Sequence, residues 1–263
     1  MNVYLRELKT WRKNTALWIA ALCVGTLFLF WMYPTFAQNV APLQEMLNRF
    51  PPALQAAFGL SADTIGSVNG FYAFVITFLT LCGAVQAMML GLSAMGRETA
   101  GKTTDFLLTR PVTRGRVLTA KLLGVFTCIT VTSAVFLGVS AGMAHAAGGA
   151  FDFRPFLLIS LTFYFEQVMF LAMGFCIGAL APRIRSPLPV ALSTVFGFFV
   201  IGMAAAALDR PELYYLAPFK YFDTLNILMR LAYRPSFVLA ACVLTGGCVL
   251  AAYAGFLRRD LRA

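Results

Sequence analysis

Histidine and charged side chains are scarce in this chain. His145 is the only histidine, and 12% of the 263 residues are charged. A single histidine excludes any multi-histidine metal site and any catalytic mechanism that needs a second histidine nearby. Paired acids and metal-binding motifs are also missing from the sequence. We therefore predict no catalytic residue and no metal site, and expect His145 to lie at the interfacial end of an apolar segment.

Cysteine pairs with redox or metal spacing are absent as well. The chain has six cysteines and no C-x-x-C motif, and every cysteine lies within an apolar segment: Cys23, Cys82, Cys128, Cys176, Cys242 and Cys248. Cysteines in such segments behave as small apolar residues. We expect them to be reduced, and a structural disulfide stays open as the alternative.

Apolar residues dominate the sequence instead. They make up 60% of the chain, and its mean hydropathy is +0.77. Since a helix needs about 20 apolar residues to cross a membrane, we predict an all-α membrane protein, one domain over 1–263, with six spans at 15–36, 69–95, 117–146, 156–181, 188–208 and 236–257. The first apolar run, 16–32, is long for a signal peptide, so we interpret it as a retained span.

The distribution of lysine and arginine predicts the orientation of these spans. With the N-terminus inside, fifteen of these residues lie on the cytoplasmic side and six on the outer side. Cytoplasmic loops carry such an excess. We therefore expect a multi-pass protein of the bacterial cytoplasmic membrane with both termini in the cytoplasm. The net charge of +10 follows from this topology and from contact with anionic membrane lipids, so nucleic-acid binding is not needed to explain it.

Two shorter segments are predicted beside the spans. Tyr4, Leu8 and Trp11 recur at helical spacing among basic residues, which predicts an N-terminal interfacial helix. The alternative is a helical extension of the first span. Between the last two spans, residues 225–231 are too few to cross a membrane but too apolar for open water, which predicts a short re-entrant helix at the outer face.

A few polar side chains fall inside the predicted spans. Glu166 is the only acid deep in a span, and Gln86 and Thr130 lie within two others. Since polar groups are costly in hydrocarbon, these three residues are candidates for a substrate pathway. The alternative is that they bond to neighbouring helices. Two G-x-x-x-G pairs, Gly138 with Gly142 and Gly174 with Gly178, predict close helix contacts.

The loop between the second and third spans supports two incompatible interpretations. Gly96, Gly101, Lys102 and Thr103 match the phosphate-binding spacing G-x-x-x-x-G-K-[ST]. That motif needs a buried strand before it and a helix after it, whereas an apolar run from about Phe71 leads directly into Gly96. The nucleotide-binding interpretation is therefore disfavoured.

The same loop resembles the cytoplasmic loop of type 2 ABC transporter permeases, the membrane subunits of exporters. The matching residues are Glu98, Gly101, Thr103, Leu107, Leu108, Pro111, Arg114, Ala120, Lys121, Leu122 and Leu123. Lys102, between the glycine and the threonine, departs from the pattern. The last outer loop, with the sequence Ala-Pro-Phe-Lys-Tyr-Phe at 217–222, is similar to a segment of a bacterial subgroup of these permeases.

The resemblance implies that the loop 96–116 contains a coupling helix that docks on a separate ATP-binding subunit through Phe106, Leu107 and Leu108. It further implies that two permease chains, alike or different, and two ATPase chains form the exporter, and that ATP and magnesium are bound by the partner subunits. An ATP-independent secondary transporter is the alternative, and a membrane-embedded lipid-modifying enzyme is a weaker one. The sequence does not indicate the transported substrate.

Overall fold

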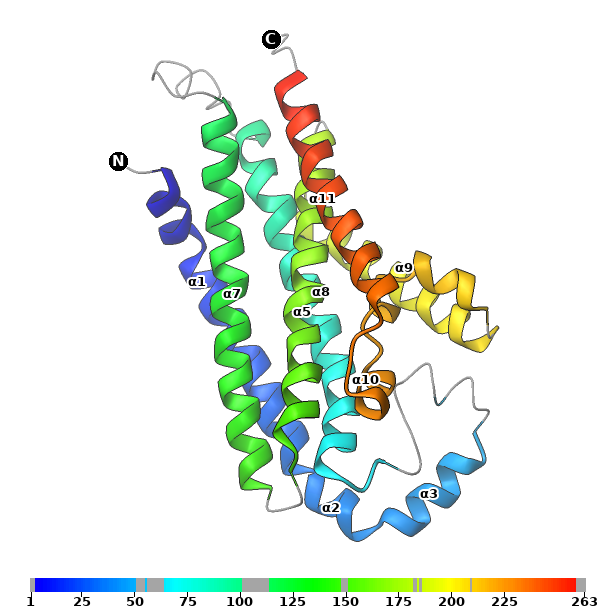
Figure 1. The fold of residues 1–263 in the computed structure, drawn as a ribbon. Coiled ribbons are helices and arrows are strands. Elements are labelled where there is room, and N and C mark those ends of the chain that lie inside the picture. Colours follow the sequence, from blue (N-terminus) through cyan, green and yellow to red (C-terminus); the bar gives the residue numbers. More distant parts are fainter. Residues whose placement is uncertain are drawn as a thin grey trace.

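A computed structural model describes residues 3–50, 55, 64–100, 114–147, 151–181, 184, 186–208 and 210–258, with side chains throughout except at 97–100, 114, 211 and 258. All regular elements in these ranges are helices (Figure 1). The long ones are α1 (Val3–Trp31), α5 (Val68–Ala100), α7 (Arg114–Ala146), α8 (Phe153–Leu180), α9 (Pro187–Ala207) and α11 (Pro235–Arg258). The short ones are α2 (Tyr33–Gln38), α3 (Val40–Asn48), η1 (Pro211–Leu216), η2 (Pro218–Lys220) and α10 (Thr224–Arg230).

Six of these helical segments are long and apolar enough to cross a membrane. They include the six long helices, and each corresponds to one segment predicted from hydropathy. The prediction of an all-α, multi-pass membrane protein is thus confirmed. The beginning of α1 and the end of α11 lie at the same end of the bundle, at the top of Figure 1, which we call the terminal end.

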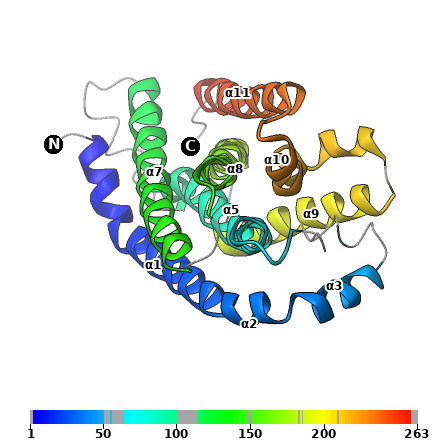
Figure 2. The same ribbon diagram turned by 60° about the horizontal axis from the view of Figure 1, so that its bottom comes forward.

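Helices α5 and α8 form the centre of the bundle. Figure 2 shows α1 and α7 on one side of this pair, α9 and α10 on the other, and α11 beside α8. The largest fully buried side chains come mainly from the central pair, among them Phe71, Tyr72 and Phe163. By contrast, α1, α9 and α11 leave many large apolar side chains uncovered, including Leu17, Val200 and Leu250. This surface suits lipid or a second membrane chain.

Glycines allow the two central helices to approach closely. A Cβ atom built on Gly174 of α8 would collide with the Met88 carbonyl oxygen of α5, and one on Gly91 of α5 would lie 2.5 Å from the Leu171 carbonyl oxygen of α8. A Cβ atom on Gly138 or Gly142 of α7 would meet nothing within 4 Å among the described residues. Only one of the two G-x-x-x-G pairs, that on α8, therefore supports a close helix contact within this chain.

The N-terminal residues do not form the predicted separate interfacial helix. They are the first turns of α1, which runs without interruption from Val3 to Trp31. Its sequence contains no proline, so nothing breaks the helix before the first span. Trp11, one of the residues that predicted the interfacial helix, is buried and donates a hydrogen bond to Glu7, while the Tyr4 hydroxyl bonds with Thr127 of α7 at 3.0 Å.

The connection between α9 and α11 contains the predicted short helix, α10. Asp223 caps α10 by accepting a hydrogen bond from the Asn226 backbone at 3.0 Å. The helix ends at Arg230, and the C-cap residue Leu231 has a left-handed backbone conformation. Thr224 donates to the Ala73 carbonyl of α5, and the Tyr233 hydroxyl to the Leu158 carbonyl of α8. These bonds hold the connection against the central helices.

A polar cavity against the central helices

Glu166 lies at the centre of the long helix α8. It follows Phe153 by 13 residues and precedes Leu180 by 14 residues. Its side chain is only 4% exposed, and its Oε2 atom has no hydrogen-bond partner among the described residues. A buried carboxyl oxygen without a partner is costly. Hydrogen bonds to neighbouring helices therefore do not by themselves account for Glu166 at this position.

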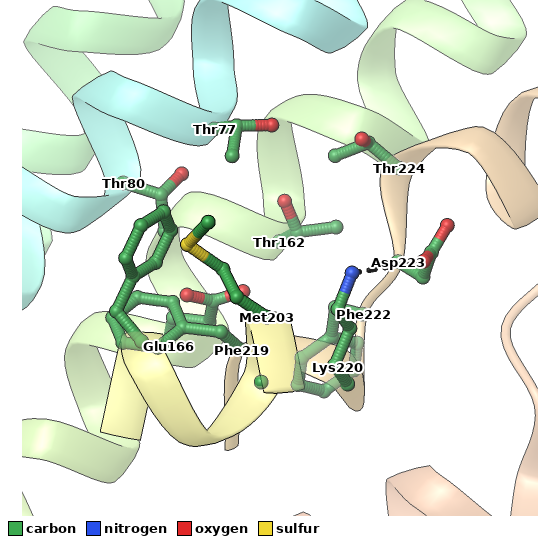
Figure 3. Close-up of a pocket in the computed structure, with 12 residues that line it drawn as sticks. Thr77, Thr80, Thr162, Glu166, Met203, Phe219, Lys220, Phe222, Asp223 and Thr224 are labelled. Carbon is green, nitrogen blue, oxygen red and sulfur yellow. Dashed lines mark ion pairs between the residues drawn. The ribbon is translucent and has the colours of Figure 1, made fainter. Parts of the chain in front are cut away.

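A small polar cavity adjoins Glu166 (Figure 3). Its volume is about 40 Å³, and since roughly 10–15 Å³ accommodates one water, it has room for a few water molecules but not for a lipid. Four threonines from three elements contribute hydroxyl groups to its wall: Thr77 and Thr80 of α5, Thr162 of α8, and Thr224 of α10. The cavity can therefore hydrate the Glu166 carboxyl.

Lys220 and Asp223 line the same cavity from the α9–α11 connection. The Lys220 ammonium is 3.8 Å from the Asp223 carboxylate, a contact that Figure 3 shows as a dashed line. Both side chains are largely buried, so water screens their charges less than it would at a free surface. The structure thus brings one cation and two carboxyl groups together against the central helices.

Gln86, the second candidate, lies in a closed network between α5, α7 and α8. Its amide nitrogen donates to Thr132, and its amide oxygen accepts from Gln167. Gln167 also accepts from Ser133 at 2.7 Å. Gln86 and Gln167 are fully buried. This arrangement matches the alternative in which the polar residues bond across helices.

Thr130, the third candidate, is exposed on α7. It donates to the Phe126 carbonyl of its own helix and bonds with the Tyr164 hydroxyl of α8 at 3.2 Å. Gln86 and Thr130 are not among the residues that line the cavity beside Glu166. The three candidates therefore do not meet at one site in this chain.

The predicted coupling residues fall largely outside the described part of the chain. Gly101, Thr103, Phe106, Leu107, Leu108 and Pro111 lie there, while Glu98 belongs to α5 and Arg114 begins α7, without described side chains. Lys121, one of the residues that match the permease pattern, is described and is buried. Its ammonium donates to the Ala94 carbonyl at 2.7 Å. This bond joins the two helices that flank the loop.

The remaining sequence predictions concern His145 and the cysteines. His145 is exposed in the last turn of α7, at a helix end as expected. The six cysteines are all free, so none forms a disulfide.

Sequence reasoning missed the association of Lys220 and Asp223 with Glu166. The sequence places both residues in the outer loop between the last two spans, where charged side chains are usually solvated. Their position beside residues 225–231, which are predicted to enter the membrane, is the signal that indicates a contact with the spans.

The family comparison agrees with this architecture. The sequence model of the family described as ABC-2 family transporter protein matches residues 1–261. The chain therefore belongs to the ABC-2 family of transporter membrane proteins, and the predicted resemblance to type 2 ABC transporter permeases is confirmed. A search of curated proteins found no significant match.

Proposed function

We propose that this chain is the permease subunit of an ATP-driven exporter and that separate subunits bind ATP and magnesium. The family match over 1–261 carries this proposal. The loop residues that resemble the coupling helix of type 2 permeases support it. The working assembly would contain two permease chains, identical or different, and two ATP-binding subunits.

The helices on either side of the loop can transmit its movement. α5 is a central helix packed closely on α8, and the Lys121 bond to Ala94 ties the start of α7 to α5. A displacement at the loop would therefore act on both helices together. Glu98, Arg114 and the apolar residues Phe106, Leu107 and Leu108 would form the docking surface for the ATP-binding subunit.

ATP hydrolysis is expected only when the partner is present. The chain alone should show no activity, and Lys102→Ala should alter coupling modestly, because the loop lacks the strand that a phosphate-binding lysine requires. The measurement is ATP hydrolysis by the purified permease, the ATP-binding subunit and their complex. Hydrolysis by the isolated permease that Lys102→Ala abolishes would refute the permease assignment.

Glu166 is our main candidate for the substrate pathway, because it combines an unsatisfied carboxyl oxygen with an adjoining cavity. Gln86 and Thr130 are secondary candidates that would join a pathway only through helix movement or a second chain. In the reconstituted complex, Glu166→Gln should slow ATP-driven export while assembly is retained. An unchanged export rate would remove Glu166 from the pathway.

The orientation we propose places the terminal end of the bundle in the cytoplasm of a bacterial cell. Cysteine introduced at Ser67 or Glu212, both exposed, should then react in intact cells with a membrane-impermeant thiol reagent. Cysteine at Arg116, also exposed, should react only after permeabilisation. A background with the six native cysteines replaced provides the control, and the opposite labelling pattern would invert the topology.

A further inference from the structure

A second, larger cavity adjoins the one beside Glu166. Its volume is about 270 Å³, and α10, the end of α9 and the start of α11 line it. Lys220 and Asp223 border both cavities. This volume is close to the lower end of the range for small-molecule pockets, about 300 Å³. The cavity can therefore hold a group the size of a lipid headgroup.

Arg234 presents an unsatisfied donor in the wall of this cavity. Its Nη2 atom donates to the Asn226 side-chain oxygen at 3.0 Å. Among the described residues, its buried Nε atom has no hydrogen-bond partner and no carboxylate pairs with it. The guanidinium carbon lies 5.9 Å from the centre of the Phe237 ring. Because arginine is always charged in proteins, Arg234 is a cation without an anionic partner in the part of the chain that the structure describes.

Among the described residues that line the cavity, Lys220 and Arg234 are cations and Asp223 is the only acid. Asp223 already faces Lys220 and caps α10. Tyr233 stays neutral, because burial raises its pKa to about 12, and burial likewise raises the pKa of Tyr221. An anionic ligand group would therefore give Arg234 the partner that it lacks among the described residues.

The depth of the cavity indicates where that anion comes from. Tyr233 of its wall donates to the carbonyl of Leu158, which lies five residues into α8, or about 7.5 Å at 1.5 Å per residue. The apolar part of α5, Val68–Gly96, has 29 residues and spans roughly 43 Å, the thickness of a bilayer with its headgroups. The cavity thus lies where headgroups meet hydrocarbon.

We propose that this cavity binds the phosphodiester group of a membrane lipid from the adjacent leaflet. Arg234 donates to the phosphate oxygens through Nε and its remaining guanidinium hydrogens, and Lys220 adds a second positive charge at the same wall. A phosphodiester supplies a negative charge for Arg234, and a guanidinium matches its oxygens with paired donors. The inference is independent of ATP coupling.

Lipid titration of the purified full-length chain, followed by native mass spectrometry, tests this site. The probes are phosphatidylglycerol and diacylglycerol with the same acyl chains. Arg234→Gln should weaken phosphatidylglycerol binding roughly tenfold, as expected for the loss of hydrogen bonds to a charged group. Arg230→Gln is the control, because it removes the same charge from an exposed position on α10. This variant should change the affinity for phosphatidylglycerol by less than about twofold.

Three further measurements keep the proposal open to refutation. Diacylglycerol should bind all variants equally weakly. Arg234→Lys keeps the charge but loses the paired donors, so its affinity for phosphatidylglycerol should lie between those of the wild type and Arg234→Gln. If Arg234→Gln unfolds, phosphatidylglycerol should still raise the wild-type melting temperature more than diacylglycerol does. Equal binding by the two glutamine variants, or Arg234-dependent binding of inorganic phosphate but not of phosphatidylglycerol, would overturn the assignment.

Discussion

Leu107→Asp is expected to release the ATP-binding subunit while the permease itself still folds. If Phe106, Leu107 and Leu108 dock in an apolar groove of the partner, a carboxylate at position 107 loses its hydration there without gaining a counter-charge. The cost is about 2–5 kcal/mol. Since each 1.4 kcal/mol is tenfold in affinity, association should weaken by roughly 30-fold to several thousandfold, and transport should stop.

Co-purification of the ATP-binding subunit with wild-type and variant permease measures this effect, and a melting curve of each permease reports folding. Thr109→Asp is the matched control, since it adds the same charge to the loop but removes no apolar side chain and, on a helix, faces away from position 107. A Leu107→Asp chain that keeps its partner would refute the docking assignment. A chain that unfolds on its own would show that Leu107 packs within the permease.

Hydropathy was sufficient to predict the six spans, because each apolar run is long and the structure consists of helices wherever it is described. The short helix α10 was also predictable from residues 225–231. The interfacial helix was predicted wrongly because amphipathic spacing does not show where a helix ends. With no proline before Pro34, the amphipathic segment and the first span form one helix.

The polar residues show the limit of sequence reasoning more clearly. Hydropathy identified Glu166, Gln86 and Thr130 as unusual, but it does not state which face of a helix meets which neighbour. Gln86 meets Thr132 and Gln167 in a closed network. Lys220 lies in the wall of the cavity beside Glu166 because α5, α8, α9 and the α9–α11 connection pack together there. A local sequence pattern does not predict such a contact between distant segments.

Gly174→Val is expected to disrupt the contact between the two central helices. The smallest side chain at this position already collides with the Met88 carbonyl oxygen and comes within 3.1 Å of the Met88 Cα atom. These are backbone atoms that cannot rotate away, so α5 and α8 must separate. Overpacking of this kind costs about 3 kcal/mol, and at 2–4 °C per kcal/mol the melting temperature should fall by about 6–12 °C.

Gly138→Val in α7 is the matched control, because it introduces the same side chain into a membrane helix at a position where a Cβ atom meets no described residue within 4 Å. Valine there should leave the melting temperature of the isolated chain nearly unchanged. Thermal unfolding of both variants in the same detergent, at one heating rate, makes the comparison. Equal melting temperatures would contradict the close α5–α8 contact. A loss of stability only at Gly138, and only in the assembled transporter, would instead locate the tight helix contact between chains.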